Sequence, residues 1–213
     1  MPNYIWYACY GSNLLMERFL CYIKGGTAPG SQFTNPGARD DTLPVDIRPY
    51  TIERPLYFGE KSSQWQNGGV GFLEIEATPN GSSHGRIYKI TDQQFEDVVL
   101  QENRLEPGSL AQSIARPEPG QSSVVFETSY GRILCLEILE DTPVFTFTRP
   151  TNLPKQQRFR PSIQYLTTII AGLLETNPNI KQEDVISYFM NTEAAELGPE
   201  KIQEVINNLE NAE

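Results

Sequence analysis

The first twenty-three residues predict a strand, a turn and a helix in immediate succession. An apolar run from Tyr4 to Cys9 is typical of a buried strand, and it stops at Gly11-Ser12-Asn13. Apolar residues at helical spacing follow at once, in Leu14, Leu15, Phe19, Leu20 and Ile23. Such a junction points backbone N–H groups at one place, with the positive end of a helix dipole behind them. The turn can therefore bind a carboxylate or a developing oxyanion, or it can simply cap the helix.

Length and charge narrow the class of protein. A chain of 213 residues is long enough for one domain with a sizeable core. A net charge of −10 argues against nucleic acid or an anionic membrane as a partner. The start of the chain lacks the basic and apolar regions of a signal peptide, and no apolar run reaches the ~20 residues of a membrane span. We expect a cytoplasmic protein.

Cysteine and histidine usage restricts the chemistry. The three cysteines, Cys9, Cys21 and Cys135, are isolated, so they predict neither a disulfide framework nor a zinc site. His84 is the only histidine, and it lies in a segment that resembles an exposed turn. A histidine-ligated metal is therefore not expected, and we predict no metal and no cofactor. Carboxylates and backbone groups remain as the candidate chemical groups.

The pattern along the chain predicts an α+β fold with mostly antiparallel strands. Two segments rich in Gly, Pro and polar residues, about 25–50 and 103–129, are typical of loop insertions. Helices are expected after Thr91, which begins a capping box with Gln94, and from Pro161 onward. The expected strands cover residues 4–9, 56–58, 70–75, 86–90, 124–126, 133–139 and 144–148. A small, strongly curved sheet or barrel is the expected form.

The helix after Thr91 has a carboxylate where its pattern predicts an apolar side chain. Phe95, Val98 and Val99 lie at positions i, i+3 and i+4 of the apolar stripe, and Glu102 occupies i+7. Burial would raise the pKa of such a carboxyl toward neutrality and suit it to proton transfer. The alternative is that the helix ends near Asn103 and leaves Glu102 in solvent.

Four segments, in this order, resemble the gamma-glutamylcyclotransferase family over about residues 4–175. They are Tyr10-Gly11-Ser12-Asn13-Leu14 with Glu17-Arg18; Trp65 with Gly68-Gly69-Val70; Gly85-Arg86-Ile87-Tyr88 leading to Glu102; and Pro161-Ser162-Ile163-Gln164-Tyr165 with Ile170 and Gly172. The resemblance implies a small β-barrel of mixed topology with flanking helices. It also implies a domain over residues 1–178, followed by a helical extension over 179–213.

The resemblance further implies a metal-independent enzyme, classed as a transferase or lyase, that releases 5-oxoproline from a γ-glutamyl compound. Glu102 would be the general acid and base that takes a proton from the α-ammonium and returns one to the departing amine. The residues implied to bind the substrate are Tyr7, Tyr10, Gly11, Ser12, Asn13, Leu14 and Tyr165. The implied partner is a small γ-glutamyl molecule. We expect the helices after residue 178 either to cover the barrel or to form a homodimer contact.

This sequence departs from the family pattern around the glutamate. Such enzymes often have a second active-site tyrosine shortly after it, whereas here the polar segment 103–129 intervenes and Tyr130 is the candidate. Two other functions stay open. One is a non-catalytic module that binds a carboxylate or γ-glutamyl ligand. The other is a hydrolase with Ser12 or Cys9 as its nucleophile and His84 as its only conventional base.

Overall fold

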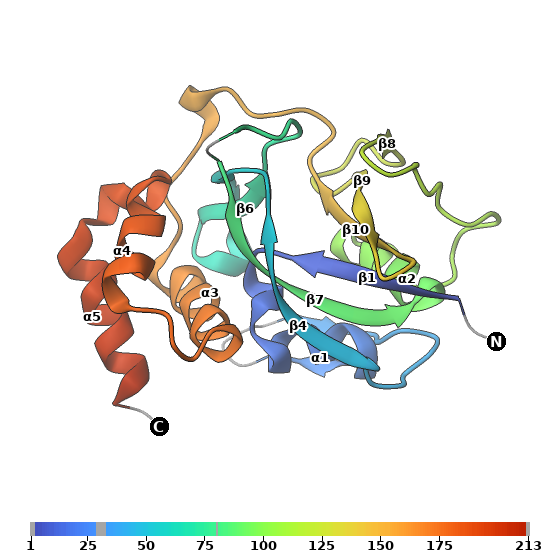
Figure 1. Ribbon diagram of the computed structural model, residues 1–213, viewed down its shortest axis with the longest axis horizontal. Helices are drawn as coiled ribbons and strands as arrows, with labels where there is room; N and C mark the ends of the chain where they lie inside the picture. Colours follow the sequence, from blue (N-terminus) through green and yellow to red (C-terminus); the bar gives the residue numbers. More distant parts are fainter. Residues whose placement is uncertain (1–2, 29–32, 80, 212–213) are drawn as a thin grey trace.

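The computed structural model describes residues 3–28, 33–79 and 81–211. Its largest sheet has six strands in the order β4-β7-β1-β10-β9-β8. Strand β1 lies inside this sheet, antiparallel to β7 and parallel to β10 (Figure 1). The six strands are β1 (Tyr4–Cys9), β4 (Asp46–Ile52), β7 (Ser83–Thr91), β8 (Ser122–Val124), β9 (Arg132–Leu139) and β10 (Thr142–Thr148).

Two short ladders and nine helical segments complete the described part of the chain. The ladders pair β2 (Gly26–Thr27) with β3 (Thr34–Asn35), and β5 (Leu56–Ser62) with β6 (Gly68–Leu73). The α-helices are α1 (Met16–Lys24), α2 (Asp92–Glu102), α3 (Ile163–Thr176), α4 (Gln182–Met190) and α5 (Pro199–Glu210). The 3-10 turns are η1 (Ser12–Leu14), η2 (Ser63–Trp65), η3 (Lys155–Gln157) and η4 (Glu193–Leu197). The predicted α+β class is confirmed.

The described strands do not close into the barrel that we expected. The β5–β6 ladder stands apart from the six-stranded sheet, although it lies beside the end of β10. A side chain makes the connection: the Thr148 hydroxyl accepts from the Leu73 N–H at 3.0 Å and donates to the Leu73 carbonyl at 2.8 Å. One threonine thus replaces the backbone hydrogen bonds that would have continued the sheet.

The segment predicted as a loop over residues 25–50 contains a strand at its end. Residues 46–52 form β4, which pairs with β7 from Asp46 opposite Lys89 to Ile52 opposite Ser83. Strand β4 is at the edge of the sheet and mostly half-buried, and at that position it tolerates Pro49 and polar residues such as Asp46. These features hide a strand in the sequence. Residues 29–32 of the same segment lie outside the described residues.

The C-terminal helices pack together at one side of the molecule (Figure 1). Apolar residues of α3, α4 and α5 belong to the same buried cluster as the sheet, among them Leu166, Phe189 and Ile202. Gly172 of α3 lies directly against the backbone of Leu14 and Leu15, where a Cβ atom would collide. Helix α3 therefore supports the turn after β1. Among the described residues, no helix is long and apolar enough to cross a membrane.

Candidate active site

A cavity of about 390 Å³ opens where the turn after β1 meets the end of α2. Segments far apart in the sequence form its wall: η1, the β5–η2 segment, the loop before β9, and α3. Seven of the eight residues that the sequence suggested for a site line this cavity: Tyr7, Tyr10, Gly11, Ser12, Asn13, Glu102 and Tyr165. The fold therefore brings together two segments that the sequence separates by about ninety residues.

Leu14 is the suggested residue that does not line the cavity. Its side chain is buried in the core against Gly172 of α3. Its backbone N–H donates to the Gly11 carbonyl at 3.0 Å, which closes the 3-10 turn. Leu14 therefore shapes the turn, and Gly11, Ser12 and Asn13 are the residues that face the cavity.

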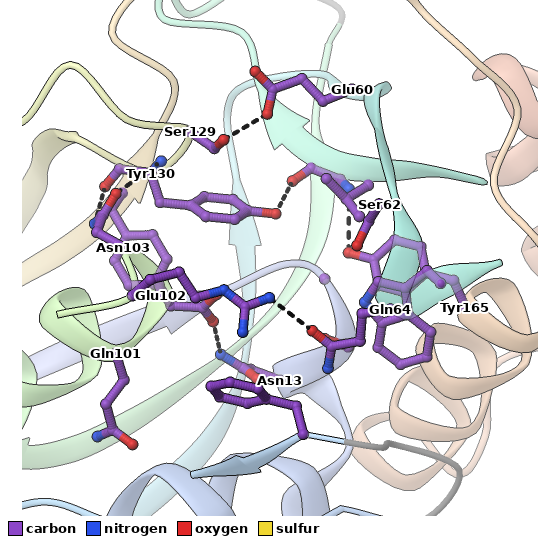
Figure 2. Close-up of a pocket in the computed structure, with 18 of the residues that line it drawn as sticks. Asn13, Glu60, Ser62, Gln64, Gln101, Glu102, Asn103, Ser129, Tyr130 and Tyr165 are labelled. Atoms are coloured by element: carbon purple, nitrogen blue, oxygen red, sulfur yellow. Dashed lines mark hydrogen bonds between the residues drawn. The ribbon is translucent and has the colours of Figure 1, made fainter. Parts of the chain in front are cut away.

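Glu102 is the last residue of α2, and its carboxylate is half-buried in the cavity. Asn13 donates from Nδ2 to Glu102 Oε1 at 3.1 Å and to the Tyr7 hydroxyl at 3.2 Å (Figure 2). Burial raises the pKa of the Glu102 carboxyl, while the charge of Arg18 and hydrogen bonds from Tyr22 and Asn13 oppose that rise. The environment thus favours a carboxyl that can both accept and release a proton.

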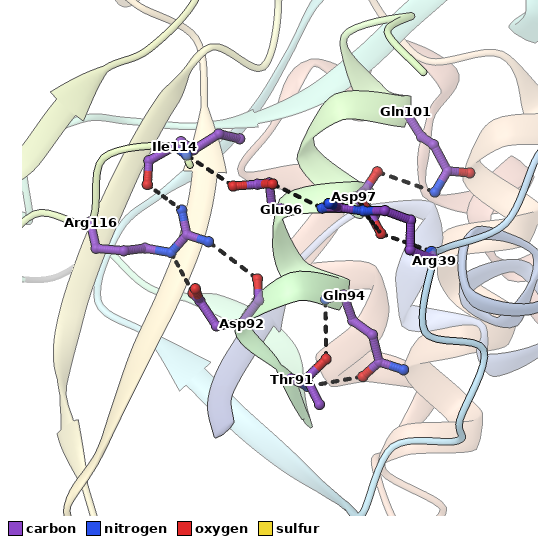
Figure 3. A network of polar contacts seen from close by, with 9 residues as sticks. All are labelled: Arg39, Thr91, Asp92, Gln94, Glu96, Asp97, Gln101, Ile114 and Arg116. Atoms are coloured by element: carbon purple, nitrogen blue, oxygen red, sulfur yellow. Dashed lines mark hydrogen bonds and ion pairs between the residues drawn. The ribbon is translucent and has the colours of Figure 1, made fainter. Parts of the chain in front are cut away.

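Helix α2 begins with the predicted capping box. The Thr91 hydroxyl accepts from the Gln94 N–H, and the Gln94 side chain accepts from the Thr91 N–H. Further along the helix, Asp97 is fully buried and Glu96 nearly so, although both are acidic. Arg39 contacts both carboxylates, with Nη2 2.9 Å from Glu96 Oε1 (Figure 3). The loop that carries Arg39 is therefore attached to the helix that ends at Glu102.

The other long loop attaches to the opposite side of α2. The Ile114 N–H donates to Glu96 Oε2 at 2.9 Å, and Arg116 Nε donates to Asp92 Oδ1 at 2.6 Å (Figure 3). The two segments predicted as insertions thus pack on the helix and fix its position.

Tyr165 of α3 faces the turn from across the cavity. Its hydroxyl accepts from the Gly71 N–H at 3.1 Å, and the backbone of Ser12 also hydrogen-bonds to it. Burial raises the pKa of Tyr165 to about 12, so it stays a neutral phenol at physiological pH. Ser162 caps the start of α3 by accepting from the Tyr165 N–H.

Tyr130 also lines the cavity, as we anticipated for the residue after the polar loop. Its hydroxyl donates to the Gly71 carbonyl at 3.2 Å, and its ring packs against Phe72. Asn103 holds the loop in place: Nδ2 donates to the carbonyls of Val99 and Tyr130, and Oδ1 accepts from the Thr128 hydroxyl (Figure 2). The residue directly after Glu102 thus positions the second tyrosine.

Several residues of the cavity wall were not predicted from the sequence. Arg18, Tyr22 and Trp65 are all buried and face the same space. Arg18 and Trp65 occur within the family-like segments, but their pattern carried no indication of a role. Tyr22 lies four residues after Arg18 on α1, which is the spacing that places two side chains on one helix face. That spacing is the signal that could have linked them.

The arrangement argues against a nucleophilic hydrolase. Cys9 is buried in β1, and burial raises the pKa of its thiol to about 12. The Ser12 hydroxyl accepts a hydrogen bond from Arg18 Nε at 3.0 Å, so its oxygen is held by a cation rather than activated by a base. His84 lies in β7 and not in the exposed turn that we predicted; its ring packs against Tyr188.

Solved structures resemble this one over most of their length. No family model matches the chain. A structure of gamma-glutamyl cyclotransferase superposes with a TM-score of 0.52 at 17% identity, covering 86% of both chains. The chain has the gamma-glutamyl cyclotransferase fold. An uncharacterized protein from Homo sapiens shares it, with a TM-score of 0.51, 19% identity and 86% coverage of both chains. The resemblance read from the four sequence segments is thereby confirmed for the fold.

A curated protein is also similar in sequence. It is histone deacetylase 5 of Arabidopsis thaliana, which is 32% identical over 195 residues. The match covers 84% of this chain and 29% of that protein, so the chain spans less than a third of the relative's length.

Proposed function

We propose that this protein is a cyclotransferase that converts a γ-glutamyl compound into 5-oxoproline and releases an amine, amino acid or peptide. One observation carries the proposal: the half-buried Glu102 carboxyl, its pKa raised by burial, is hydrogen-bonded to Asn13 of the turn in the wall of a cavity. The fold shared with gamma-glutamyl cyclotransferase supports it. We do not extend deacetylation to this chain, since it spans only 29% of the length of the deacetylase.

In the proposed reaction Glu102 moves protons and the rest of the cavity holds the substrate in a cyclic pose. Glu102 takes a proton from the α-ammonium, and the freed nitrogen attacks the γ-carbonyl carbon. A ring C–N bond forms and the bond to the departing nitrogen breaks. The α-nitrogen loses two protons in total and the departing nitrogen gains two, so Glu102 carries each in turn. Attack within one molecule needs chiefly orientation and exclusion of water.

The decisive experiment assays 5-oxoproline after incubation with γ-glutamyl amines, amino acids and peptides. Wild type should form product, and Glu102→Gln should lower kcat by about 10³-fold because general acid–base catalysis is lost. The exposed Glu106 gives the matched control, since Glu106→Gln removes a nearby carboxylate outside the cavity. Product formation that survives Glu102→Gln contradicts the role of Glu102. Ligand-dependent thermal stabilisation without product favours a binding module instead.

A further inference from the structure

The cavity contains a buried cation, Arg18, which the proposed proton transfer does not use. Arg18 lies near the start of α1 and its residue is only 5% exposed. Its Nε donates to Ser12 Oγ at 3.0 Å, and its Nη2 donates to the Tyr22 hydroxyl at 3.4 Å. The guanidinium also lies over the Trp65 ring, 5.2 Å from its centroid. These contacts hold the group in one position on the cavity wall.

The remaining nitrogen of this guanidinium has no partner. Arg18 Nη1 is buried and makes no hydrogen bond within the described residues, and no carboxylate among them lies within 4.0 Å of Arg18. Burying a cation without an anion, or a donor without an acceptor, is unfavourable. An anionic ligand in the cavity would remove both costs.

The negative charge of Glu102 lies close to Arg18 but does not pair with it. Tyr22 stands between them: its hydroxyl accepts from Arg18 and hydrogen-bonds to Glu102. Next to Glu102, Asn13 Oδ1 is buried and makes no hydrogen bond within the described residues. The cavity therefore offers a cationic donor and, separately, a set of acceptors. An α-amino acid, with an ammonium and a carboxylate on one carbon, has the complementary pair of charges.

We propose that Arg18 binds the α-carboxylate of the γ-glutamyl group and so selects substrates that carry it; this inference rests on the proposed function. With the carboxylate on Arg18, the α-ammonium of the same carbon is directed to Glu102 and Asn13 Oδ1, where its proton is removed. The turn of Gly11, Ser12 and Asn13 is then left for the γ-carbonyl oxygen. The backbone N–H groups of Gly11 and Asn13 would stabilise the negative charge that develops there, while the backbone of Ser12 hydrogen-bonds to Tyr165.

The test compares two substrates that differ only in the α-carboxylate: a γ-glutamyl alkylamide, and the 4-aminobutyryl alkylamide that would cyclise to 2-pyrrolidinone. Neither has a carboxylate on the departing amine. Arg18→Gln should lower kcat/KM for the γ-glutamyl compound about 100-fold, mainly through KM, as expected for a lost charged hydrogen bond. It should leave the slower turnover of the 4-aminobutyryl compound unchanged. Arg18→Lys keeps the charge and should lie between.

The matched control is Arg48→Gln, which removes a guanidinium outside the cavity and should change neither substrate's kinetics. An equal loss on both compounds, or no loss on either, overturns the role of Arg18. A loss that appears only with γ-glutamyl amino acids, and not with the alkylamide, assigns Arg18 to the departing group and also overturns it. If Arg18→Gln does not fold, Arg18→Lys is compared on the same two compounds.

A second measurement separates this inference from the proposed function. If wild type forms no product from any γ-glutamyl compound, the cyclotransferase proposal fails. Calorimetry with 5-oxoproline and 2-pyrrolidinone then tests Arg18 without turnover, since these ligands differ only in the carboxylate. Wild type should bind 5-oxoproline more tightly, and the Arg18 variants should lose that preference. Absence of any preference in wild type overturns the inference.

Discussion

The two sides of the cavity are held in place by contacts of very different range. On one side, the turn after β1 is closed by hydrogen bonds from Leu14 to Gly11 and from Leu15 to Ser12, each between residues three apart. On the other side, the helix that ends at Glu102 is held by Arg39, which lies 58 residues from its partner Asp97. The binding side is therefore largely local, and the catalytic side depends on the rest of the fold.

The acidic residues of α2 also differ from one another in their environments. Asp97 and Glu96 are buried, but Arg39 and the Ile114 N–H compensate them. Glu102 has hydrogen bonds from Asn13 and Tyr22 and no ion pair within the described residues. A carboxylate paired with a cation or an N–H donor helps to fix the helix. A carboxyl with a raised pKa is instead suited to exchanging protons. The same helix thus carries structural and chemical acids at different positions.

The largest expected effect comes from removing Arg39, whose long-range ion pairs hold α2. Arg39→Ala leaves the buried Asp97 and Glu96 carboxylates without their cation, and should lower the free energy of unfolding by about 3 kcal/mol. Chemical denaturation measures this. The control is Arg48→Gln, because Arg48 is about as exposed as Arg39 but pairs with the more exposed carboxylates of Asp46 and Glu140, and its loss should cost much less. Equal losses in the two variants would show that the loop of Arg39 does not hold the helix.

A smaller effect is expected from disturbing the local side. Gly172→Ala places a methyl group against the backbone of Leu14 and Leu15, and should cost about 2 kcal/mol through overpacking. Because the displaced turn faces the cavity, KM for a γ-glutamyl substrate should rise more than kcat falls. Unfolding and steady-state kinetics check both points. Unchanged KM at reduced stability would show that the turn keeps its shape without support from α3.

The smallest effect concerns Glu102 itself and has a defined dependence on pH. Its folded-state pKa is raised above the ordinary 4.5, so the folded protein retains a proton that the unfolded chain releases. Stability from this group is therefore lost as pH rises from about 4.5 through the raised pKa. Glu102→Gln should match wild type in melting temperature near pH 4 and exceed it increasingly toward pH 8. A constant or opposite difference would contradict the raised pKa.

Much of the local structure was predictable because neighbouring residues determine it. Thr91 and Gln94 form the expected capping box, and the strands around Ile87 and Ile133 lie where β-branched residues cluster. Strand β4 was missed because Asp46 and Pro49 are typical of a loop, whereas an edge strand tolerates them. The barrel is not confirmed, and the reason is related: Thr148 joins β10 to β6 through its side chain, and no periodicity reveals such a contact.

The sequence by itself determined the turn after β1 and the position of Glu102 on an otherwise apolar helix face, because both depend on spacing within a few residues. Only the tertiary structure decided that the two meet, that Leu14 faces the core, and that Tyr130 reaches the cavity after a long loop. It also decided that Arg18 is buried there with a free N–H. Burial and charge compensation arise from residues distant in sequence, so their consequences emerge only when the chain is folded.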